Sequence, residues 1–350
     1  MKKGVLLINL GSPDHPDKKS VARYLREFLN DPRVIDIPVV IRKLLVNAII
    51  TPFRASKTAA AYQKIWTHSG SPLIAHTVDL QHALSHELGS NYVVEVGMRY
   101  GKPDIFFALN QLKDCDDIAI IPLFPQYSSA ATGSAVEQCM RYYISQWTIP
   151  SLTFVKDFYN DPGFIAAFAD NINQATASKQ IDMLLLSYHG LPERHVIKSG
   201  CHGSCDLLHP CTRDNAQNNY CYRAQCFETS LLLAEKLNLS QEQYRVAFQS
   251  RLGKTPWIKP YTDLLLPELI SQGVKNIAIA CPSFVADCLE TLEEINIRAR
   301  EQWQQLGGNE FTYISCINDH PLWVKSLAKM IICDKRAVSS YSEMMNLISK

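Results

Sequence analysis

The sequence lacks any long apolar run and any marked excess of charge of one sign. No stretch approaches the ~20 apolar residues that a membrane-spanning helix needs. Lysine and arginine (35) nearly balance aspartate and glutamate (34), which leaves a formal net charge of +1. This balance argues against a dedicated nucleic-acid binder, which normally carries a basic excess on one face. With 47% hydrophobic residues, the chain has enough apolar sequence to form a core and is not expected to be disordered.

Nucleotide-binding glycine patterns are also missing. Gly253-Lys254-Thr255 resembles the end of a phosphate loop, but Phe248 stands where the first glycine of that motif is required. Pro256 then interrupts the helix that has to follow. No dinucleotide-binding glycine pattern follows a predicted strand either. We therefore expect no nucleotide cofactor, which removes most kinases, ATPases and dehydrogenases from consideration.

Short apolar runs alternate with amphipathic stretches along the chain, a pattern typical of an α/β fold with parallel sheets flanked by helices. The runs are continuous in Val, Ile and Leu, as expected for strands buried on both faces. A helix is predicted over Val21–Leu29, with Ser20 as its N-cap and Asn30-Asp31-Pro32 as its end. The predicted strands are Gly4–Asn9, Val93–Gly97, Asp117–Pro122, Leu152–Val155, Asp182–Tyr188, Tyr244–Gln249 and Asn276–Ala280.

At 350 residues, the chain is long enough for two domains with separate cores. We place the boundary near Asp157–Pro162, just before a second series of strands and helices begins. The expected division is an N-terminal domain of residues 1–157 and a C-terminal domain of residues 158–315. Residues 316–350 are expected to form a helical segment that packs back on the N-terminal domain.

The N-terminus resembles a signal peptide only in its first residues. Lys2 and Lys3 precede the apolar run Val5–Ile8, but the run stops at Asn9 and no small-residue cleavage site follows. We interpret the run as a buried strand and expect a cytoplasmic protein. Thiols stay reduced in the cytoplasm, so the 11 cysteines suggest metal binding before disulfides.

Four predicted strands end in unusual loops, and function in such sheets collects at the carboxyl ends of strands. The loops begin at Asn9, Leu123, His189 and Cys281, and we expect them to line one cleft between two domains. His189 leaves a buried strand there, and an imidazole accepts protons near neutral pH or ligates a transition metal. The alternative interpretation is a histidine that only forms a hydrogen bond within its own loop.

A predicted helix that opens at Asp287 carries a series of carboxylates. Asp287, Glu290 and Glu294 are spaced so that they share one helix face. Leu289, Leu292 and Ile295 lie on another face and are expected to pack against the sheet. If the acidic face points into the cleft, its carboxylates can take up protons or guide a hard cation. Acidic residues in a first turn also simply suit the helix dipole.

Several segments together resemble the ferrochelatases, in the right order and over nearly the whole chain. Three of them are the most specific: Ser187–Pro192, Phe248–Arg251 with Trp257, and Ala286–Glu294. The others are Asn9–Pro13, Ile65-Trp66 with Gly70–Leu73, Arg99-Tyr100, and Pro125–Ser128.

The resemblance implies two Rossmann-like domains of the chelatase type with a porphyrin in the cleft between them. It implies a lyase of haem biosynthesis that inserts Fe²⁺ into protoporphyrin IX without a nucleotide. His189 and Glu290 match the family's catalytic and iron-binding pair, with His189 as base or first iron ligand. Asp287 and Glu294 match a path for protons or metal. Coproporphyrin III is an alternative substrate, and a haem- or metal-binding regulator is an alternative of another class.

The resemblance also implies a set of porphyrin-binding residues from both halves of the chain. Arg54 and Arg99 match positions near the propionates, where a guanidinium suits a carboxylate. Trp257, Tyr127 and Phe124 would supply aromatic walls that favour a distorted, more reactive macrocycle. The complete set is Leu10, Ser12, Pro13, Arg54, Arg99, Tyr100, Phe124, Gln126, Tyr127, Ser128 and Trp257.

Residues 198–226 form a Cys-rich insertion relative to family members that lack an iron–sulfur cluster. Thiolates so placed bind Zn²⁺ or a [2Fe–2S] cluster, and the resemblance favours the cluster over zinc or free thiols. Four ligands suffice, so one cysteine is spare, and the spacing does not say which. Ser129 occupies the internal ligand position of the different cluster found in animal enzymes, so that type is not expected. The candidate ligands are Cys201, Cys205, Cys211, Cys221 and Cys226.

Residues 35–53 are rich in Ile, Val and Leu, interleaved with Arg42 and Lys43. The segment is predicted to form an apolar lip that touches lipid while the protein receives a hydrophobic porphyrin, giving peripheral membrane contact. A helix buried on the domain is the alternative.

Overall fold

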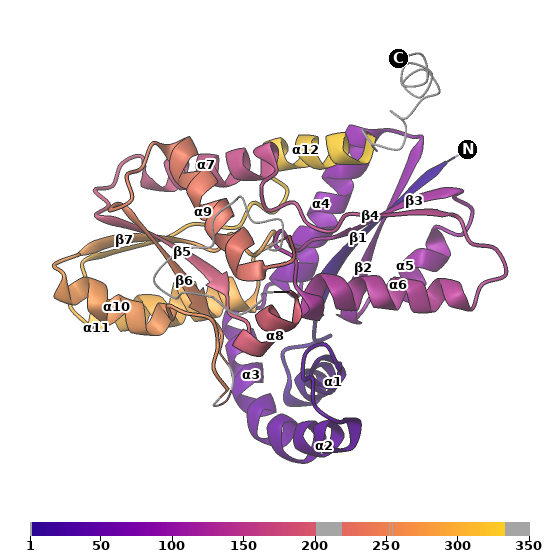
Figure 1. Cartoon of the computed structure of the whole chain (residues 1–350), viewed down its shortest axis with the longest axis horizontal. Helices are drawn as coiled ribbons and strands as arrows, with labels where there is room; N and C mark the ends of the chain where they lie inside the picture. The colour runs from indigo at the N-terminus through magenta and orange to yellow at the C-terminus, as the bar shows by residue number, and fades with distance from the viewer. Residues whose placement is uncertain (1, 201–218, 252, 254, 333–350) are drawn as a thin grey trace.

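The computed structural model describes residues 2–200, 219–251, 253 and 255–332. They form two four-stranded parallel sheets, one in each half of the chain (Figure 1). The strand order of the first sheet is β2-β1-β3-β4, and that of the second is β6-β5-β7-β8. The strands are β1 (Lys3–Ser12), β2 (Tyr92–Gly101), β3 (Asp117–Pro122), β4 (Ser151–Phe154), β5 (Met183–His189), β6 (Tyr244–Gln249), β7 (Asn276–Ala280) and β8 (Glu310–Tyr313). The α/β class with parallel sheets is confirmed.

Helices cover both faces of the first sheet. On one face, α4 (Pro72–Leu88) packs against the side chains of Val5 and Leu7. On the other face, α5 (Ile105–Gln111) and α6 (Ser134–Ile144) pack against Leu6 and Ile8. Alternate residues of β1 therefore serve two different cores, which is why this strand is continuously apolar. A short π-helix, η2 (Ser129–Gly133), leads into α6.

The second sheet is covered in the same way. On one of its faces lie α7 (Pro162–Thr176) and α9 (Tyr222–Leu237), which pack on Leu184 and Leu186. The opposite face carries α10 (Thr262–Ser271), the π-helix η4 (Glu290–Ala299) and α11 (Arg300–Gln305). The short helix α8 (Glu193–Lys198) follows β5 directly and lies near the centre of the molecule in Figure 1.

The last described helix, α12 (Pro321–Ile332), contacts α4 of the first half and α7 of the second half. Trp323 on α12 is completely buried and stacks on Phe158, with 4.9 Å between the ring centroids. One continuous core cluster consequently contains residues of both sheets. Residues 333–350 lie outside the described part of the chain.

Three helical segments project from the first sheet at the bottom of Figure 1. They are α1 (Lys18–Leu29), α2 (Val39–Leu44) with the π-helix η1 (Leu45–Ile50), and α3 (Thr51–Ile65). In the predicted lip, Val40 is 75% exposed and Phe53 is 80% exposed. Most apolar side chains of α2 are thus exposed, which differs from the alternative of a helix buried on the domain. Among the described residues, no helix is long and apolar enough to cross a membrane.

Several local predictions need correction. The N-cap of α1 is Asp17, whose carboxylate accepts from the backbone N–H groups of Lys19 and Ser20, so Ser20 is inside the helix and not its cap. Asn30 ends the helix as predicted. Strand β8 was not predicted from the sequence, because its four residues Glu310–Tyr313 form only a short apolar pattern. Leu289 and Leu292 do not pack against the sheet: they join a cluster with α1 and α3, whereas Ile295 does reach the sheet core.

Candidate active site

His189 is the last residue of β5 and is held on three sides. Its backbone N–H donates to Ser283 Oγ (2.9 Å), and its carbonyl accepts from the Tyr222 hydroxyl (2.8 Å). On the ring, Nδ1 lies 2.6 Å from the carbonyl oxygen of Gly190. A carbonyl oxygen can only accept, so Nδ1 carries the proton and the Nε2 lone pair is left available. The ring is thereby set up to accept a proton or bind a metal through Nε2.

Glu290 and Glu294 lie on η4, and Glu294 interacts with His189 across the site. Burial raises the pKa of Glu294, and the charge of Glu290 raises it further. Hydrogen bonds from Ser250 and the charges of Arg298 and His189 act in the opposite direction. Gln249, the register partner of His189, donates to the Glu290 carbonyl (2.9 Å), and Ser250 N–H donates to Glu294 (2.9 Å). The structure thus brings the three predicted residues to the same end of the second sheet.

The first half of the chain contributes two buried phenols near Glu290. Burial, followed by the charge of Glu290, raises the pKa of Tyr62 on α3. Burial also raises the pKa of Tyr24 on α1, and the charge of Glu290 adds to this effect. The Tyr24 hydroxyl donates to the carbonyl of Gly11 at the end of β1 (3.2 Å). The acidic residues of η4 therefore lie where the two halves of the molecule meet.

Asp287 does not share a face with the other two carboxylates, contrary to the sequence prediction. The side chain is 4% exposed and precedes η4. Its oxygens accept from the Tyr313 hydroxyl, Thr291 Oγ1 (3.1 Å) and Asn318 Nδ2 (3.0 Å). α-Helical spacing does not apply to Asp287, because this residue lies in the non-helical segment before η4. Asp287 connects η4 to the β8–α12 segment.

Gly190 allows the loop after His189 to approach its neighbours closely. A Cβ atom at this position would lie 2.7 Å from the carbonyl oxygen of Gln249 and 3.3 Å from the Trp257 ring. Trp257 is half-buried and pairs with Pro192 through an isolated bridge. Glycine at this position thus lets the loop after His189 lie against the Gln249 carbonyl, with the predicted aromatic residue Trp257 beside it.

The end of β1 also lies beside the site. Gly11 has a φ of +109°, and a Cβ there would collide with the carbonyl oxygen of Tyr100. Ser12 and Pro13 follow and are buried. Leu10 packs in the same cluster as Leu289 and Leu292 beside η4. Arg54 on α3 is exposed as a whole residue, although burial around its guanidinium lowers its pKa.

A model of the ferrochelatase family matches residues 2–334 of this sequence. The chain belongs to the ferrochelatase family. Membership makes it an enzyme, a lyase of haem biosynthesis. It is 54% identical to a ferrochelatase of Legionella pneumophila over 331 residues, which are 95% of this chain and 99% of that protein. It is 48% identical to a ferrochelatase of Coxiella burnetii, over 94% of this chain and 93% of that protein.

Solved structures of other chelatases support the same fold. The sirohydrochlorin chelatase SirB from Bacillus subtilis spizizenii, in complex with cobalt, matches with a TM-score of 0.53 at 11% identity, over 94% of this chain and 93% of that one. SirB from Bacillus subtilis with Fe³⁺ matches with a TM-score of 0.54 at 15% identity, over 98% of both chains. At such low identity the likeness concerns the fold alone. The chelatase-type architecture that the ferrochelatase resemblance implied is confirmed.

Two residues of the expected ferrochelatase porphyrin site have internal partners instead of a free surface. Arg99 donates to Asp31 Oδ2 (2.6 Å) and Ser134 Oγ (2.6 Å). The Tyr100 side chain is 1% exposed, and its hydroxyl donates to the same carboxylate (2.9 Å). This buried cluster joins the end of α1 to β2 and α6. In the described conformation, Arg99 and Tyr100 maintain the scaffold around the site.

The segment after β3 connects the two halves of this ferrochelatase-family chain. Buried Gln126 donates through Nε2 to Thr229 Oγ1 (3.0 Å) and to the carbonyl of Pro282 (3.2 Å). Ser128 caps η2, and Phe124 packs on the core of the first sheet. Tyr127 donates its backbone N–H to Gln225 Oε1 (2.6 Å). Of the four, Tyr127 lies half-exposed at a cavity.

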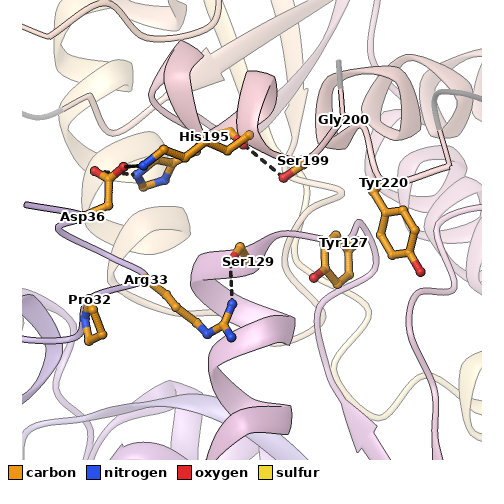
Figure 2. Close-up of a pocket in the computed structure, with 10 residues that line it drawn as sticks. Pro32, Arg33, Asp36, Tyr127, Ser129, His195, Ser199, Gly200 and Tyr220 are labelled. Atoms are coloured by element: carbon orange, nitrogen blue, oxygen red, sulfur yellow. Dashed lines mark hydrogen bonds and ion pairs between the residues drawn. The ribbon is translucent and has the colours of Figure 1, made fainter. Parts of the chain in front are cut away.

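That cavity, of about 490 Å³, lies beside α8 (Figure 2). Figure 2 shows Asp36 of the first half facing His195 of α8. The Asp36 carboxylate accepts from Arg194 Nε (2.8 Å) and Lys198 Nζ (2.5 Å), and His195 Nε2 lies 3.2 Å away. Burial opposes ionisation of Asp36, but the hydrogen bonds from Arg194 and Lys198 hold its pKa well below the usual range. Neither His189 nor Glu290 lines this cavity.

Of the five insertion cysteines, only Cys221 and Cys226 belong to the described residues. Cys201, Cys205 and Cys211 lie outside them. Cys221 stands at the N-cap position of α9, and Cys226 lies one and a half turns into the same helix. Both thiols are buried, and burial raises the pKa of Cys226. Among the described residues, no group of three or more potential ligands has metal-site geometry.

Several residues at the site were not singled out for a role from the sequence. Tyr24, Tyr62 and Ser250 surround the acidic residues of η4, and Gln249 contacts the backbone of Glu290. Tyrosines on amphipathic helices are usually core residues, so no local signal distinguished the first two. Gln249 and Ser250 were quoted within a family motif, and a polar pair at the end of a buried strand was the available signal.

Proposed function

We propose that the protein inserts Fe²⁺ into protoporphyrin IX to form haem. The observation that carries this proposal is the meeting of three groups at the junction of the two halves: an imidazole with a free Nε2 on one side, and Glu290 and Glu294 on the other. Insertion replaces two pyrrole N–H protons by the metal ion, so the reaction needs a proton acceptor next to the macrocycle. Fe²⁺ is the substrate metal here.

In this proposal, His189 acts through Nε2 on one face of the porphyrin. The Gly190 carbonyl fixes the tautomer by accepting from Nδ1, and it also stabilises the imidazolium that forms when Nε2 takes a proton. Glu290 serves the opposite face, and Glu294 passes protons or metal onward. The pH dependence of Fe²⁺ binding in the absence of porphyrin tests whether Nε2 first accepts a proton or first binds iron.

The porphyrin walls come from both halves. Trp257 beside Gly190 and Leu10 beside η4 offer apolar surface for the flat macrocycle. Arg54 is exposed on α3, and a guanidinium suits a propionate. Arg99 and Tyr100 would support this site indirectly, because their polar atoms already bind Asp31.

Anaerobic incubation of the purified protein with Fe²⁺ and protoporphyrin IX tests the proposal through the absorbance change on haem formation. Coproporphyrin III is assayed in parallel. Faster turnover of protoporphyrin IX supports the proposal, whereas preference for coproporphyrin III identifies the other substrate. Tight haem binding without turnover of either porphyrin would overturn the enzymatic role.

We further propose that the α2–η1 lip touches the membrane surface from which a hydrophobic porphyrin is taken up. Val40 and Leu44 on α2 and Phe53 at the start of α3 are exposed, and the same helices carry the exposed cations Lys43 and Lys57. Apolar side chains with cations suit an anionic lipid surface. The protein should sediment with phosphatidylglycerol vesicles more than with phosphatidylcholine vesicles, and Phe53→Ser should weaken this binding. Trp147→Ser, at a fully exposed site elsewhere, is the control.

We also propose a [2Fe–2S] cluster held by Cys201, Cys205, Cys211 and Cys221, with Cys226 as the spare thiol. Cys221 is at the N-terminus of α9, where the helix dipole favours a thiolate. Both thiols are buried, but Cys226 lies inside α9 and away from its N-terminus, where burial favours the neutral thiol. A brown protein should lose visible absorption in Cys221→Ser and keep it in Cys226→Ser. A colourless protein with stoichiometric zinc would contradict the cluster.

A further inference from the structure

Gln249, at the end of β6, lies between the strand that carries His189 and the helix that carries Glu290. In the parallel register of the second sheet, Gln249 pairs with His189 itself. Its backbone carbonyl accepts from the Gly190 N–H (2.7 Å), directly after His189. Its side-chain amide donates from Nε2 to the backbone carbonyl of Glu290 (2.9 Å). One residue therefore contacts both sides of the candidate active site.

The orientation of the Gln249 amide is fixed by its partners. The Glu290 carbonyl can only accept, so the NH₂ group has to face it and Oε1 has to face the other way. There, Ser187 donates its hydroxyl hydrogen to Oε1 (2.7 Å). Since that hydrogen is used, the Thr262 hydroxyl donates to Ser187 Oγ (2.8 Å). The result is a directed series of hydrogen bonds from Thr262 to the main chain of Glu290.

Burial makes the loss of any hydrogen bond in this series energetically costly. Gln249 is 4% exposed, and Ser187 is completely buried. A buried polar group that loses its partner keeps its desolvation cost, so the alternative arrangements of the amide are unfavourable. Ser187 also lies two residues before His189 on the same strand. The Gln249 amide thus connects Glu290, the first residue of η4, to Ser187 of β5, because its NH₂ group and its oxygen each form a hydrogen bond.

The next residue strengthens the same connection. Ser250 has a φ of +66°, a conformation that is uncommon for residues other than glycine. In it, the backbone N–H donates to Glu294 Oε1 (2.9 Å), and the hydroxyl binds the other carboxylate oxygen. The end of β6 therefore contacts η4 at two residues one turn apart, Glu290 and Glu294. Strained backbone of this kind is retained where surrounding contacts require it.

The geometry points to Gln249 as a positioning residue for metal insertion, which sets the place of Glu290 relative to His189 without touching the porphyrin or the iron. This inference rests on the proposed function for its kinetic consequence. A shift of about 1 Å in a catalytic group can cost on the order of 100-fold in rate. The substrate-binding walls around Trp257 and Leu10 are not held by this amide, so porphyrin binding should change little.

The test compares Gln249→Met with Tyr188→Phe. Gln249→Met should lower kcat at least 10-fold, toward the 100-fold expected of a misplaced group, and leave KM for the porphyrin within about twofold. Tyr188→Phe removes a buried hydrogen bond to Ser230 (2.7 Å) from the adjacent residue of β5 and should leave kcat unchanged. Equal losses of kcat in both variants would overturn the inference. If Gln249→Met does not fold, Ser187→Ala removes the Ser187 bond alone and should still lower kcat severalfold.

Two further measurements separate this inference from the proposed function. In a Glu290→Gln background, Gln249→Met should have little additional effect on the residual rate, because the two residues act as a unit. Hydrogen exchange provides a readout independent of activity. Compared with the wild-type protein, the amides of residues 288–296 should exchange faster in Gln249→Met and at the same rate in Tyr188→Phe. If the wild-type protein proves inactive but this exchange result holds, the proposed function fails and the positioning role stands. Unchanged exchange and additive rate losses would contradict the positioning role.

Discussion

At the residue scale, the chemistry of this site depends on single hydrogen bonds that define which atoms are free to react. His189 illustrates this, since the Gly190 carbonyl 2.6 Å from Nδ1 leaves only Nε2 for chemistry. Gln249 is a second example, because its neighbours permit only one orientation of the amide. Buried groups with determined partners have determined protonation and direction, and the predictions at this scale follow from that.

Substitution of His189 should remove the proton acceptor while the fold survives. The side chain is half-buried at a strand end, and the backbone bonds to Ser283 and Tyr222 do not involve the ring. His189→Ala is therefore expected to reduce turnover at least 100-fold, in the range typical of a lost general base, with an unchanged circular dichroism spectrum. Appreciable residual turnover would contradict the assigned role.

Glu294→Gln should stabilise the protein at neutral and alkaline pH. Burial raises the folded-state pKa of Glu294 above its usual value, so folding is favoured by the protonated form, and stability is lost as the pH rises through that pKa. A neutral glutamine avoids this loss. We expect a melting temperature higher by about 2 °C at pH 8, and a gain that shrinks as the pH is lowered toward 5.

The control for this titration is Glu87→Gln, at an exposed position of α4, which should leave the melting temperature unchanged at every pH. A gain for Glu294→Gln that is independent of pH would mean that packing, and not ionisation, causes the effect. A loss of stability at pH 8 would show that the hydrogen bonds from Ser250 outweigh burial.

At the scale of elements, the apolar lip is attached to the helix that follows His189. Asp36 lies between Ile35 and Ile37, whose carbonyls accept from the buried Arg42 of α2 (3.2 and 2.9 Å). Its carboxylate binds Arg194 and Lys198 of α8. Burial lowers the pKa of His195, so the two permanent cations dominate this contact near neutral pH. Residues 35–37 at the start of the lip are thus bound both to α2 and to α8.

Asp36→Asn should loosen the lip, because it removes the charge that binds α8. Hydrogen exchange of residues 37–44 is expected to become severalfold faster, and KM for the porphyrin is expected to rise more than kcat falls. Asp263→Asn, which breaks the exposed ion pair with Arg251 in the second half, serves as the control. Identical exchange of residues 37–44 in both variants would exclude the attachment.

Element prediction from the sequence succeeded where one local signal dominates. Seven strands lie where continuous Val, Ile and Leu runs predicted them, with ends shifted by up to a few residues. The π-helical turns of η4 were not predictable, because apolar spacing assumes α-helical geometry and gives no sign of a wider turn. Asp287 lies before these turns and is therefore not on the predicted acidic face, and Leu289 and Leu292 pack with α1 and α3.

At the scale of the whole molecule, the two sheets share one core cluster through α12. Trp323 is completely buried against Phe158, and its ring centroid lies 6.0 Å from that of Phe164 on α7. The helix also contacts α4 of the first half. Such a shared core favours cooperative unfolding of the two halves and fixes the relation between the side that carries Arg54 and the side that carries His189.

Trp323→Ala should therefore destabilise both halves together. Loss of a large buried aromatic side chain costs about 3–5 kcal/mol, which corresponds to a drop in melting temperature on the order of 10 °C. Calorimetry should show one transition before and after the substitution. Trp147→Ala, at a fully exposed tryptophan, should have no effect. Two separate transitions would contradict the shared core.

The sequence by itself determined the alternation of strands and helices and the burial of the strands, and it supplied the side chains that we propose for proton transfer and metal binding. These features depend on residue type and short-range spacing, which a sequence displays directly. Only the tertiary structure decided that Arg99 binds Asp31, that Asp287 is bound by Tyr313, and that Gln249 joins His189 to Glu290. Those contacts link residues far apart in the chain, and their partners depend on how sheets and helices pack, for which local spacing contains no information.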